Sequence, residues 1–281
     1  MSICGDCIMS VGDQGGTASV YTSVEVRRPG VAGPGITMDD VACEMAIALV
    51  YNGISHAVMM ASPLQLDDFA LGFSLTEGIL AHPDELYELE VLEAGNGLRI
   101  EMSVAAERFA KLRERRRTLT GRTGCGLCGA ESLSAAIRPA RRVTAPALSD
   151  AAVQGAIANL QHHQPLQAQT GASHGAAWCS REGRIVLVRE DVGRHNALDK
   201  LIGAMQRSGA ISSADCSGGF VLISSRASYE MVQKSCAVGI GALVAVSAPT
   251  SLAIEQARQA GQLLIGFARP GRHVIYHNPL Q

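Results

Sequence analysis

The stretch that decides the fold spans residues 220–268 and reads FVLISSRASYEMVQKSCAVGIGALVAVSAPTSLAIEQARQAGQLLIGFA. Short apolar runs at 220–224, 242–246 and 263–268 predict buried strands, and a segment with helical periodicity separates each run from the next. Helices are therefore expected between the strands. This alternation predicts an α/β domain in which a mainly parallel sheet carries helices on its faces.

The first part of the chain has a different pattern. Asn52-Gly53 lies between two apolar runs, and Gly95-Asn96-Gly97 separates two more, so each turn predicts a β-hairpin. Residues 66–80 place apolar side chains on one helical face, although Gly72 weakens the helical pattern. The sequence thus predicts three parts, which are a flexible tail at 1–18, a small α+β domain at 19–118 and a larger α/β domain at 119–281.

Composition excludes several classes of protein. The chain has 281 residues with 47% hydrophobic and 18% charged residues and a net charge of −2, which suits a large core and gives no signal for nucleic acid or membrane binding. No apolar run reaches the roughly 18 residues of a membrane span, and residues 1–16 lack the pattern of a secretory signal. Eight cysteines without such a signal indicate cytoplasmic thiols rather than a disulfide framework.

A Cys-x-x-Cys motif lies in the sequence RTGCGLCG at residues 122–129. A helix is expected to begin just after it, and the helix N-terminus together with the arginine that opens the motif would lower the pKa of a neighbouring thiol. Cys125 and Cys128 therefore suit sulfur chemistry, while a buried apolar pair and half of a zinc site remain alternatives. Cys4 and Cys7 share the spacing, but the distance along the chain between the two pairs is far from that of a zinc ribbon, so no metal site is predicted.

Polar side chains follow several of the predicted strands. Loops after the carboxyl ends of parallel strands line one crevice, and serine, threonine and arginine at helix starts favour phosphate. Neither a Walker loop nor a Gly-x-Gly-x-x-Gly fingerprint is present, so the sequence predicts a phosphorylated ligand outside those two classes. His174 and His195 are candidate acid–base groups. The candidate crevice residues are Asp191, Arg194, His195, Asn196, Ser224, Ser225, Arg226, Ser228, Ser247, Thr250, Ser251, Arg269 and Arg272.

Taken together, these motifs make the sequence similar to the FdhD family of formate dehydrogenase accessory sulfurtransferases. The matching segments occur in the family's order along nearly the whole chain after about residue 20, and they are far more specific than a single Cys-x-x-Cys. They are residues 121–129, 190–200, 225–234, 247–253 and 266–272.

The resemblance implies a fold and an activity. The fold is α/β, with a cytidine-deaminase-like α/β/α domain in the C-terminal part and a smaller α+β domain before it. The activity is that of a sulfur carrier, or sulfurtransferase, which takes persulfide sulfur from a cysteine desulfurase. It delivers that sulfur to the molybdenum of the bis(molybdopterin guanine dinucleotide) cofactor before the cofactor enters apo-formate dehydrogenase. The persulfide carries over to Cys125, with Cys128 as its partner, and members of the family are homodimers.

The resemblance also implies where the molybdenum cofactor binds. The family's cofactor loop carries over to residues 267–272, and GDP is expected to mimic part of the cofactor. Pro270 stands where glycine is common in the family, which puts the backbone of that loop in doubt. The residues expected to bind the cofactor are Phe267, Ala268, Arg269, Pro270, Gly271 and Arg272, together with Asp191, Arg194, His195 and Arg226.

Three other functions compete with this interpretation. A zinc deaminase needs His-x-Glu followed by Pro-Cys-x-x-Cys, but no histidine here precedes a glutamate by two residues and no proline precedes Cys125. A thioredoxin-like reductase is disfavoured because the Cys-x-x-Cys does not follow an early βαβ pattern. A cofactor-binding assembly chaperone, whose cysteines bind a metal or a partner without sulfur transfer, remains open.

Overall fold

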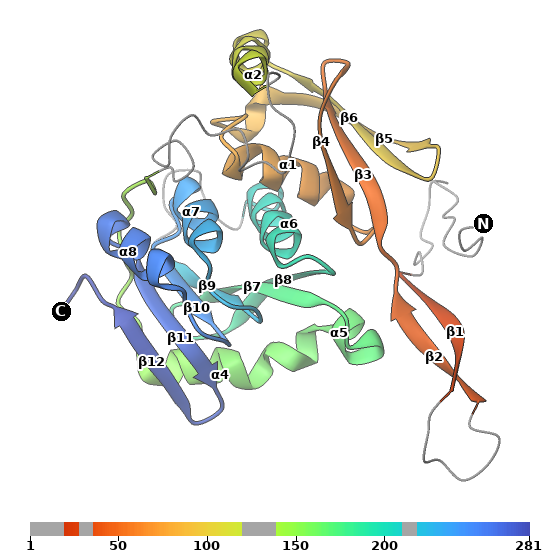
Figure 1. Ribbon diagram of the computed structural model, residues 1–281. Coiled ribbons are helices and arrows are strands. Elements are labelled where there is room, and N and C mark those ends of the chain that lie inside the picture. The colour runs from red at the N-terminus through yellow and green to blue at the C-terminus, as the bar shows by residue number, and fades with distance from the viewer. Residues whose placement is uncertain (1–19, 28–35, 120–138, 210–217) are drawn as a thin grey trace.

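A computed structural model of the chain describes residues 20–27, 36–119, 139–209 and 218–281, and it describes side chains in the second range only as far as residue 114. Figure 1 shows a six-stranded sheet with helices on both faces, a four-stranded sheet beside it and a two-stranded ribbon that extends away from both. The proposed boundaries near residues 18 and 118 border segments outside the described residues, so the domain division stays a prediction.

The larger sheet has the strand order β12-β11-β10-β9-β7-β8. Of its neighbouring pairs only β9–β10 and β10–β11 are parallel, so the prediction of a mainly parallel sheet was wrong. The hairpins β7–β8 and β11–β12 place an antiparallel strand on each side of the parallel centre. The strands are β7 (His174–Ser180), β8 (Ile185–Asp191), β9 (Gly219–Ile223), β10 (Ala242–Ala245), β11 (Leu263–Arg269) and β12 (Arg272–His277).

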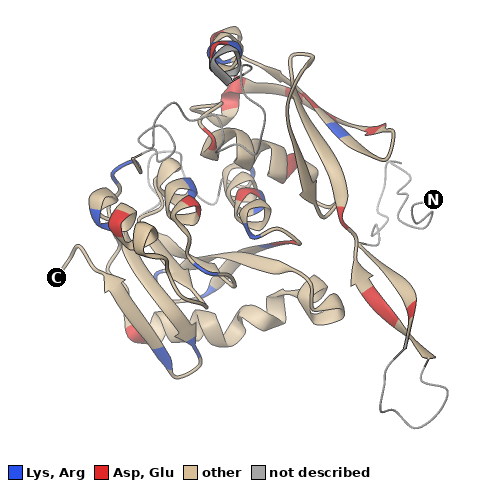
Figure 2. Cartoon of the chain, viewed as in Figure 1, with Lys and Arg blue, Asp and Glu red and all other residues tan. Residues whose placement is uncertain are grey.

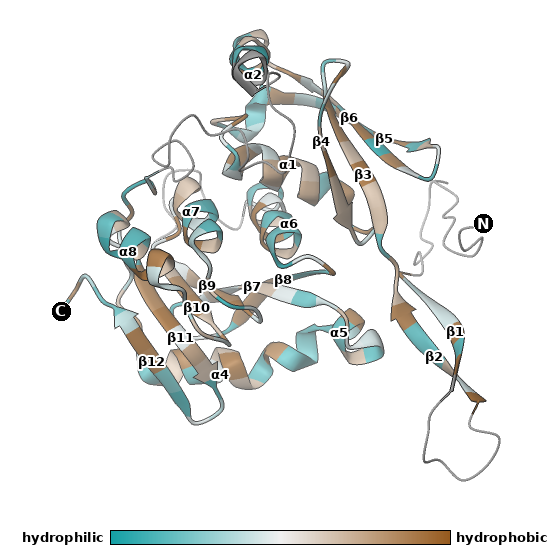
Figure 3. Ribbon diagram, viewed as in Figure 1, coloured by the Kyte–Doolittle hydropathy of each residue, from teal (hydrophilic) through white to brown (hydrophobic). Residues whose placement is uncertain are grey.

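Helices cover both faces of this sheet. The side chains of Val221 and Ile223 pack into a cluster with α6 (Arg194–Arg207), α7 (Tyr229–Ala237) and α8 (Ser251–Ala260). Phe220 and Leu222, which alternate with them, pack into a second cluster with α4 (Asp150–Leu160) on the opposite face. Burial on both faces explains why the strands are continuous apolar runs in sequence, and Figure 3 shows these apolar segments in brown.

The smaller sheet has the order β4-β3-β6-β5, and both predicted hairpins are present in it. Asn52 and Gly53 have φ values of 45° and 78°, as a type I′ turn requires. A parallel pairing of β3 with β6 joins the hairpins into one sheet. The strands are β3 (Met45–Tyr51), β4 (Ile54–Ala61), β5 (Leu86–Ala94) and β6 (Gly97–Val104), and the ribbon consists of β1 (Tyr21–Arg27) and β2 (Ile36–Ala42).

Short helical elements complete the architecture. The helix α2 (Ala106–Leu119) follows β6, and the 3-10 turns η1 (Pro83–Glu85) and η2 (Gln161–His163) precede β5 and α5 (Pro165–Thr170). Ser149 is the N-cap of α4, since its Oγ accepts a hydrogen bond from the backbone N–H of Ala152 at 3.2 Å. None of the described helices combines the length and apolar character that crossing a membrane requires.

The helix α1 (Leu66–Thr76) lies between the smaller sheet and α6, which explains why almost all of its residues are buried. The two helices touch through glycine. A Cβ added at Gly72 would lie 1.7 Å from the carbonyl oxygen of Asp199, and one at Gly203 would lie 1.9 Å from that of Asp68. Gly72, which weakened the sequence pattern of α1, is therefore needed for the close approach of the backbones.

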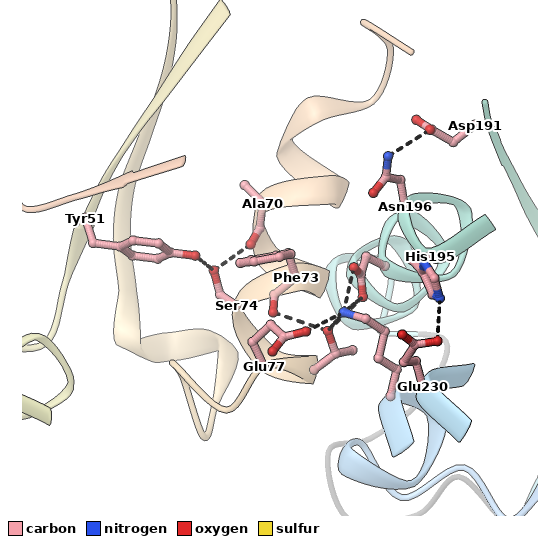
Figure 4. A network of polar contacts seen from close by, with 12 residues as sticks. Tyr51, Ala70, Phe73, Ser74, Glu77, Asp191, His195, Asn196 and Glu230 are labelled. Carbon is pink, nitrogen blue, oxygen red and sulfur yellow. Dashed lines mark hydrogen bonds and ion pairs between the residues drawn. The ribbon is translucent and has the colours of Figure 1, made fainter. Parts of the chain in front are cut away.

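A buried polar network crosses this seam between α1, α6 and α7. Lys234 Nζ lies 2.9 Å from Asp199 Oδ2, 2.9 Å from Glu77 Oε1 and 3.0 Å from Thr76 Oγ1. Figure 4 draws this network, and Figure 2 shows acidic and basic residues together on α6 and α7. Burial alone would lower the pKa of Lys234, but the carboxylates of Asp199 and Glu77 outweigh it and hold the pKa above its ordinary value. The lysine therefore stays charged and ties three helices together.

Candidate functional site

The carboxyl ends of four strands lie at one edge of the larger sheet. Strands β9, β10 and β11 are parallel, and β8 points the same way because β7, which lies between β8 and β9, is antiparallel to both. The loops that follow these strands therefore gather at this carboxyl edge, together with the beginning of β7. The sequence prediction that these loops point to the same side is confirmed.

Backbone hydrogen bonds fasten these loops to one another. The N–H of Ser247 donates to the carbonyl of Ser225 at 3.4 Å, and the N–H of Phe267 donates to the carbonyl of Ser247 at 3.1 Å. On the other side of β9, the N–H of Ser224 donates to the carbonyl of Gly175 at 2.9 Å. The edge is thus held in shape by its own backbone before any ligand arrives.

A cavity of about 440 Å³ opens at this edge, between the end of α4, the start of α5 and the strand ends. We call it the edge cavity. Its size suits a small-molecule ligand. Three of the residues expected to bind a cofactor line it, and so does the candidate acid–base group His174. The residues that line it are Ile157, Ala158, Leu160, Gln161, Gln164, Gln167, Gly171, Ser173, His174, Ser224, Val246, Ala268, Arg269 and Pro270.

The charge at this edge favours an anion. Burial, and then the nearby Arg194 guanidinium, lower the pKa of His174, which makes the imidazole neutral over a wider pH range. Arg194 begins α6, and its Nε is buried without a hydrogen-bond partner among the described residues. Arg269 adds a further cation on the cavity wall. Cationic groups with unused donors are what a phosphate or pyrophosphate requires.

Phe267 is strained at the end of β11. Its φ of 48° is in the left-handed region, which costs a residue with a Cβ roughly 1 kcal/mol, yet 37% of the residue is exposed. Gly266 before it admits no side chain, because a Cβ there would lie 2.7 Å from Pro249 Cδ. Strain at an exposed aromatic residue is typical of a functional position. Beyond it, Gly271 forms the β11–β12 turn with a φ of 79°, and Arg272 pairs with Arg269 across it.

Asp191 has a different place from the one that the sequence suggested. It is fully buried, with Oδ2 2.7 Å from Lys200 Nζ and 3.0 Å from the N–H of Ser62. Its Oδ1 accepts hydrogen bonds from the N–H of Gly193 at 2.8 Å and from Nδ2 of Asn196 at 3.0 Å, the contact that Figure 4 labels. Both oxygens of the carboxylate are thus already bound by groups of the protein. We therefore assign Asp191 to positioning the β8–α6 loop rather than to lining the cavity.

His195 and Arg226 are near the edge but do not line the edge cavity. His195 Nε2 lies 3.2 Å from Glu230 Oε2, and the hydroxyl of Ser228 donates to the same oxygen at 2.9 Å. Burial lowers the pKa of His195 and the carboxylate of Glu230 opposes that effect. Arg226 is exposed. A ligand contact of either residue stays a prediction, and it would come from the α6 and α7 side of the sheet.

The Cys-x-x-Cys motif, with Cys125 and Cys128, lies outside the described residues, as do Cys4 and Cys7. The described chain resumes beside α8, where the N–H of Ala140 donates to Gln256 Oε1 at 2.9 Å. Among the residues that the structure does describe, no three His, Cys, Asp or Glu side chains come together as a metal site would need.

Sequence reasoning missed Gln164 and Ser173, which line the edge cavity. One signal was available for the first. Residues 161–167 read QHHQPLQ, with glutamines three residues apart, and that spacing places polar side chains on one side of a helical turn. Ser173 had no comparable signal in the sequence, because its position depends on Glu190. The Ser173 hydroxyl donates a hydrogen bond to Glu190 Oε1 at 2.7 Å.

Comparisons with known proteins agree on one family. The model of the FdhD/NarQ family matches residues 42–281. A sulfur carrier protein FdhD of Cupriavidus necator is 53% identical over 249 residues, which cover 87% of this chain and 84% of that protein. One of Variovorax paradoxus is 53% identical over 242 residues and 86% of each chain.

A solved structure is also similar. It carries the description of a formate dehydrogenase accessory protein from Desulfotalea psychrophila, and it matches with a TM-score of 0.70 and 25% sequence identity. The match covers 93% of this chain and 98% of that one. The similarity therefore extends across both sheets rather than over one of them.

Proposed function

The chain belongs to the FdhD/NarQ family, and we propose from this membership that it is a sulfur carrier that serves formate dehydrogenase. In this proposal a cysteine desulfurase supplies persulfide sulfur to Cys125, with Cys128 as its partner. The sulfur then passes to the molybdenum of the bis(molybdopterin guanine dinucleotide) cofactor. The observation that carries the proposal is the match to the family model over residues 42–281, a range that includes both cysteines, together with the 53% identity to a protein described as a sulfur carrier.

The thiol chemistry of this proposal balances without a further oxidant. The Cys125 thiolate attacks the outer sulfur of the desulfurase persulfide, the sulfur–sulfur bond there breaks, and the desulfurase thiolate leaves. Cys125 then holds the persulfide. Attack by the Cys128 thiolate on the inner sulfur would release hydrosulfide and leave a Cys125–Cys128 disulfide, which a cellular thiol reductant must reduce before the next cycle.

The edge cavity is the proposed site for the guanine dinucleotide part of this substrate. Arg269 supplies positive charge for a pyrophosphate on the cavity wall. Arg194, with its unused Nε, and the strained Phe267 belong to the same edge of the sheet but do not line the cavity. The cavity volume of about 440 Å³ suits a nucleotide fragment rather than the whole cofactor. GDP is therefore the appropriate partial mimic.

The finer parts of the proposal come from the resemblance. We propose that the larger sheet and its helices form a cytidine-deaminase-like domain, that the protein acts as a homodimer in the cytoplasm, and that its partners are a cysteine desulfurase and apo-formate dehydrogenase. The α/β/α layering around β7 to β12 supports the first of these. Analytical ultracentrifugation would test the dimer.

Replacing Arg269 by alanine is expected to weaken GDP binding roughly tenfold or more, because a charge-assisted contact to phosphate is lost. The loss should grow smaller at high salt, since screening already weakens that contact in the wild type. Isothermal titration calorimetry measures it. Arg184→Ala is the matched control, because Arg184 precedes β8 at the opposite edge of the sheet and is exposed. Equal affinities of Arg269→Ala and wild type would argue against a phosphate at the edge cavity.

Intact-mass spectrometry tests sulfur transfer itself. Wild-type protein incubated with a cysteine desulfurase and cysteine is expected to gain the mass of about one sulfur atom, and a reductant should remove it. Cys125→Ala should show no such gain. A bound zinc ion in the native spectrum, with no gain of sulfur, would instead support an assembly chaperone whose cysteines bind metal.

A further inference from the structure

Gln164 is the most unusual polar residue on the wall of the edge cavity. It precedes α5 and is only 4% exposed. Its Nε2 is buried without a hydrogen-bond partner among the described residues. A buried amide donor that stays unpaired costs roughly 1–3 kcal/mol, so native proteins rarely keep one without a reason.

The backbone of β7 makes room for this side chain. A Cβ added at Gly175 would lie 2.4 Å from Gln164 Nε2 and 2.7 Å from Gln164 Cδ. The carboxamide therefore rests directly on the backbone at Gly175. That backbone is already engaged, because the N–H of Gly175 donates to Ser224 Oγ and its carbonyl accepts the N–H of Ser224, both at 2.9 Å.

Two neighbouring polar side chains on this wall, those of Gln167 and Ser173, have partners. Gln167 Oε1 accepts the N–H of Ser173 at 2.9 Å, and the Ser173 hydroxyl donates to Glu190 Oε1 at 2.7 Å. Glu190 also accepts the backbone N–H groups of Leu166 and Gln167 at 2.9 and 2.8 Å. These contacts fix the start of α5 and hence the backbone that carries Gln164. Gln164 thus lines the edge cavity from a fixed backbone and carries a buried amide donor that no described group uses.

We propose that Gln164 determines which base the edge cavity accepts, by pairing its carboxamide with the hydrogen-bonding edge of a purine. A carboxamide presents a donor beside an acceptor, and a lactam edge, as in guanine, presents the complementary acceptor and donor. Arg269 lies on the same wall, and in this proposal it binds the phosphates. The inference rests on the proposed function for the identity of the nucleotide, and it adds the residue that reads the base.

The test is calorimetric titration of the full-length protein with GDP and, separately, with inorganic pyrophosphate. Gln164→Met keeps the length of the side chain and removes its hydrogen-bonding groups. GDP affinity is expected to fall roughly tenfold to a hundredfold, while pyrophosphate affinity stays unchanged because only the base contact is lost. Gln259→Met is the matched control, since Gln259 is exposed on α8 and does not line the edge cavity.

Thermal unfolding separates a role in binding from a role in folding. Replacing an unpaired buried amide by an apolar isostere should leave the melting temperature of Gln164→Met equal to that of the wild type or raise it. A clear fall in melting temperature would show that the amide has structural partners, such as a buried water, and would overturn the inference.

The binding outcomes distinguish the inference from the proposed function. Equal GDP affinity in wild type and Gln164→Met overturns the role of Gln164 alone. A parallel loss of GDP and pyrophosphate binding also overturns it, because the change would then have altered the whole cavity. Failure of wild-type protein to bind GDP overturns the nucleotide assignment of the edge cavity, while sulfur loading on Cys125 is still decided by mass spectrometry.

Discussion

Replacing Cys125 by alanine is expected to abolish formate dehydrogenase activation in cells that lack another sulfur carrier, with a loss of roughly a hundredfold or more. The reason is that the proposed persulfide has no other site. Formate oxidation with an artificial electron acceptor in cell extracts measures the effect. An assembly chaperone predicts the opposite result, because binding of the cofactor alone would survive the substitution.

The chain supplies its own controls for this experiment. Cys179 and Cys236 are buried in the two clusters of the larger sheet, and burial raises the pKa of both thiols to about 12. These thiols therefore stay protonated at neutral pH and are shielded from a partner, which does not suit a nucleophile. Cys179→Ala should therefore retain activation in proportion to the folded protein that the cells contain. Loss of activity with Cys179→Ala at normal protein levels would contradict the assignment to Cys125.

Local patterns predicted most of the elements correctly. The runs at β9, β10 and β11 and the two hairpins depend on residues close together in sequence, and the Asn52-Gly53 turn specifies its own geometry. The exposed strand β2 and the six-residue helix α5 were missed, because neither has a strong apolar periodicity. The order of the strands in the larger sheet was harder to predict from the sequence. Nothing local shows that β7 lies between β8 and β9, since that pairing is decided by contacts between distant segments.

In the candidate site too, features that depend on local sequence were predicted, and those that depend on distant segments were not. Loops that follow strands could be assigned to one edge from the alternation alone, and Arg269 and His174 do line the edge cavity there. The place of Asp191 could not be predicted, because its carboxylate accepts a hydrogen bond from the backbone N–H of Ser62, which is 129 residues away in the sequence. Lys200 completes that contact by donating to the carbonyl of Ser62 at 2.9 Å. Asp191 was thus interpreted as a ligand group, whereas its carboxylate contacts Ser62 and Lys200 between the two sheets.

The seam between the two sheets should be the most sensitive part of the fold, and Lys234→Met tests it. The substitution leaves the carboxylate of Asp199, only 1% exposed, without its main partner, and breaking a buried ion pair costs roughly 3–5 kcal/mol. The lysine also lies 5.3 Å from the centre of the Phe73 ring, which adds a smaller cation–π contribution. We expect the urea midpoint of unfolding to fall accordingly, with a melting temperature roughly 10 °C lower.

A second ion pair across the same helices provides the comparison that decides the cause. Arg207 NH1 lies 2.9 Å from Asp67 Oδ2, and the two side chains are 49% and 51% exposed. Arg207 NH1 also lies 3.6 Å from Asp68 Oδ1, but Asp68 keeps its closer partner Arg189 at 2.8 Å, so Arg207→Met should cost less than about 1 kcal/mol. The double variant Lys234→Met, Asp199→Leu should recover much of the lost stability, because it removes the uncompensated charge as well as the pair. If Lys234→Met were no more destabilising than Arg207→Met, the buried network would not hold the seam, and the glycine contact between α1 and α6 would have to do so instead.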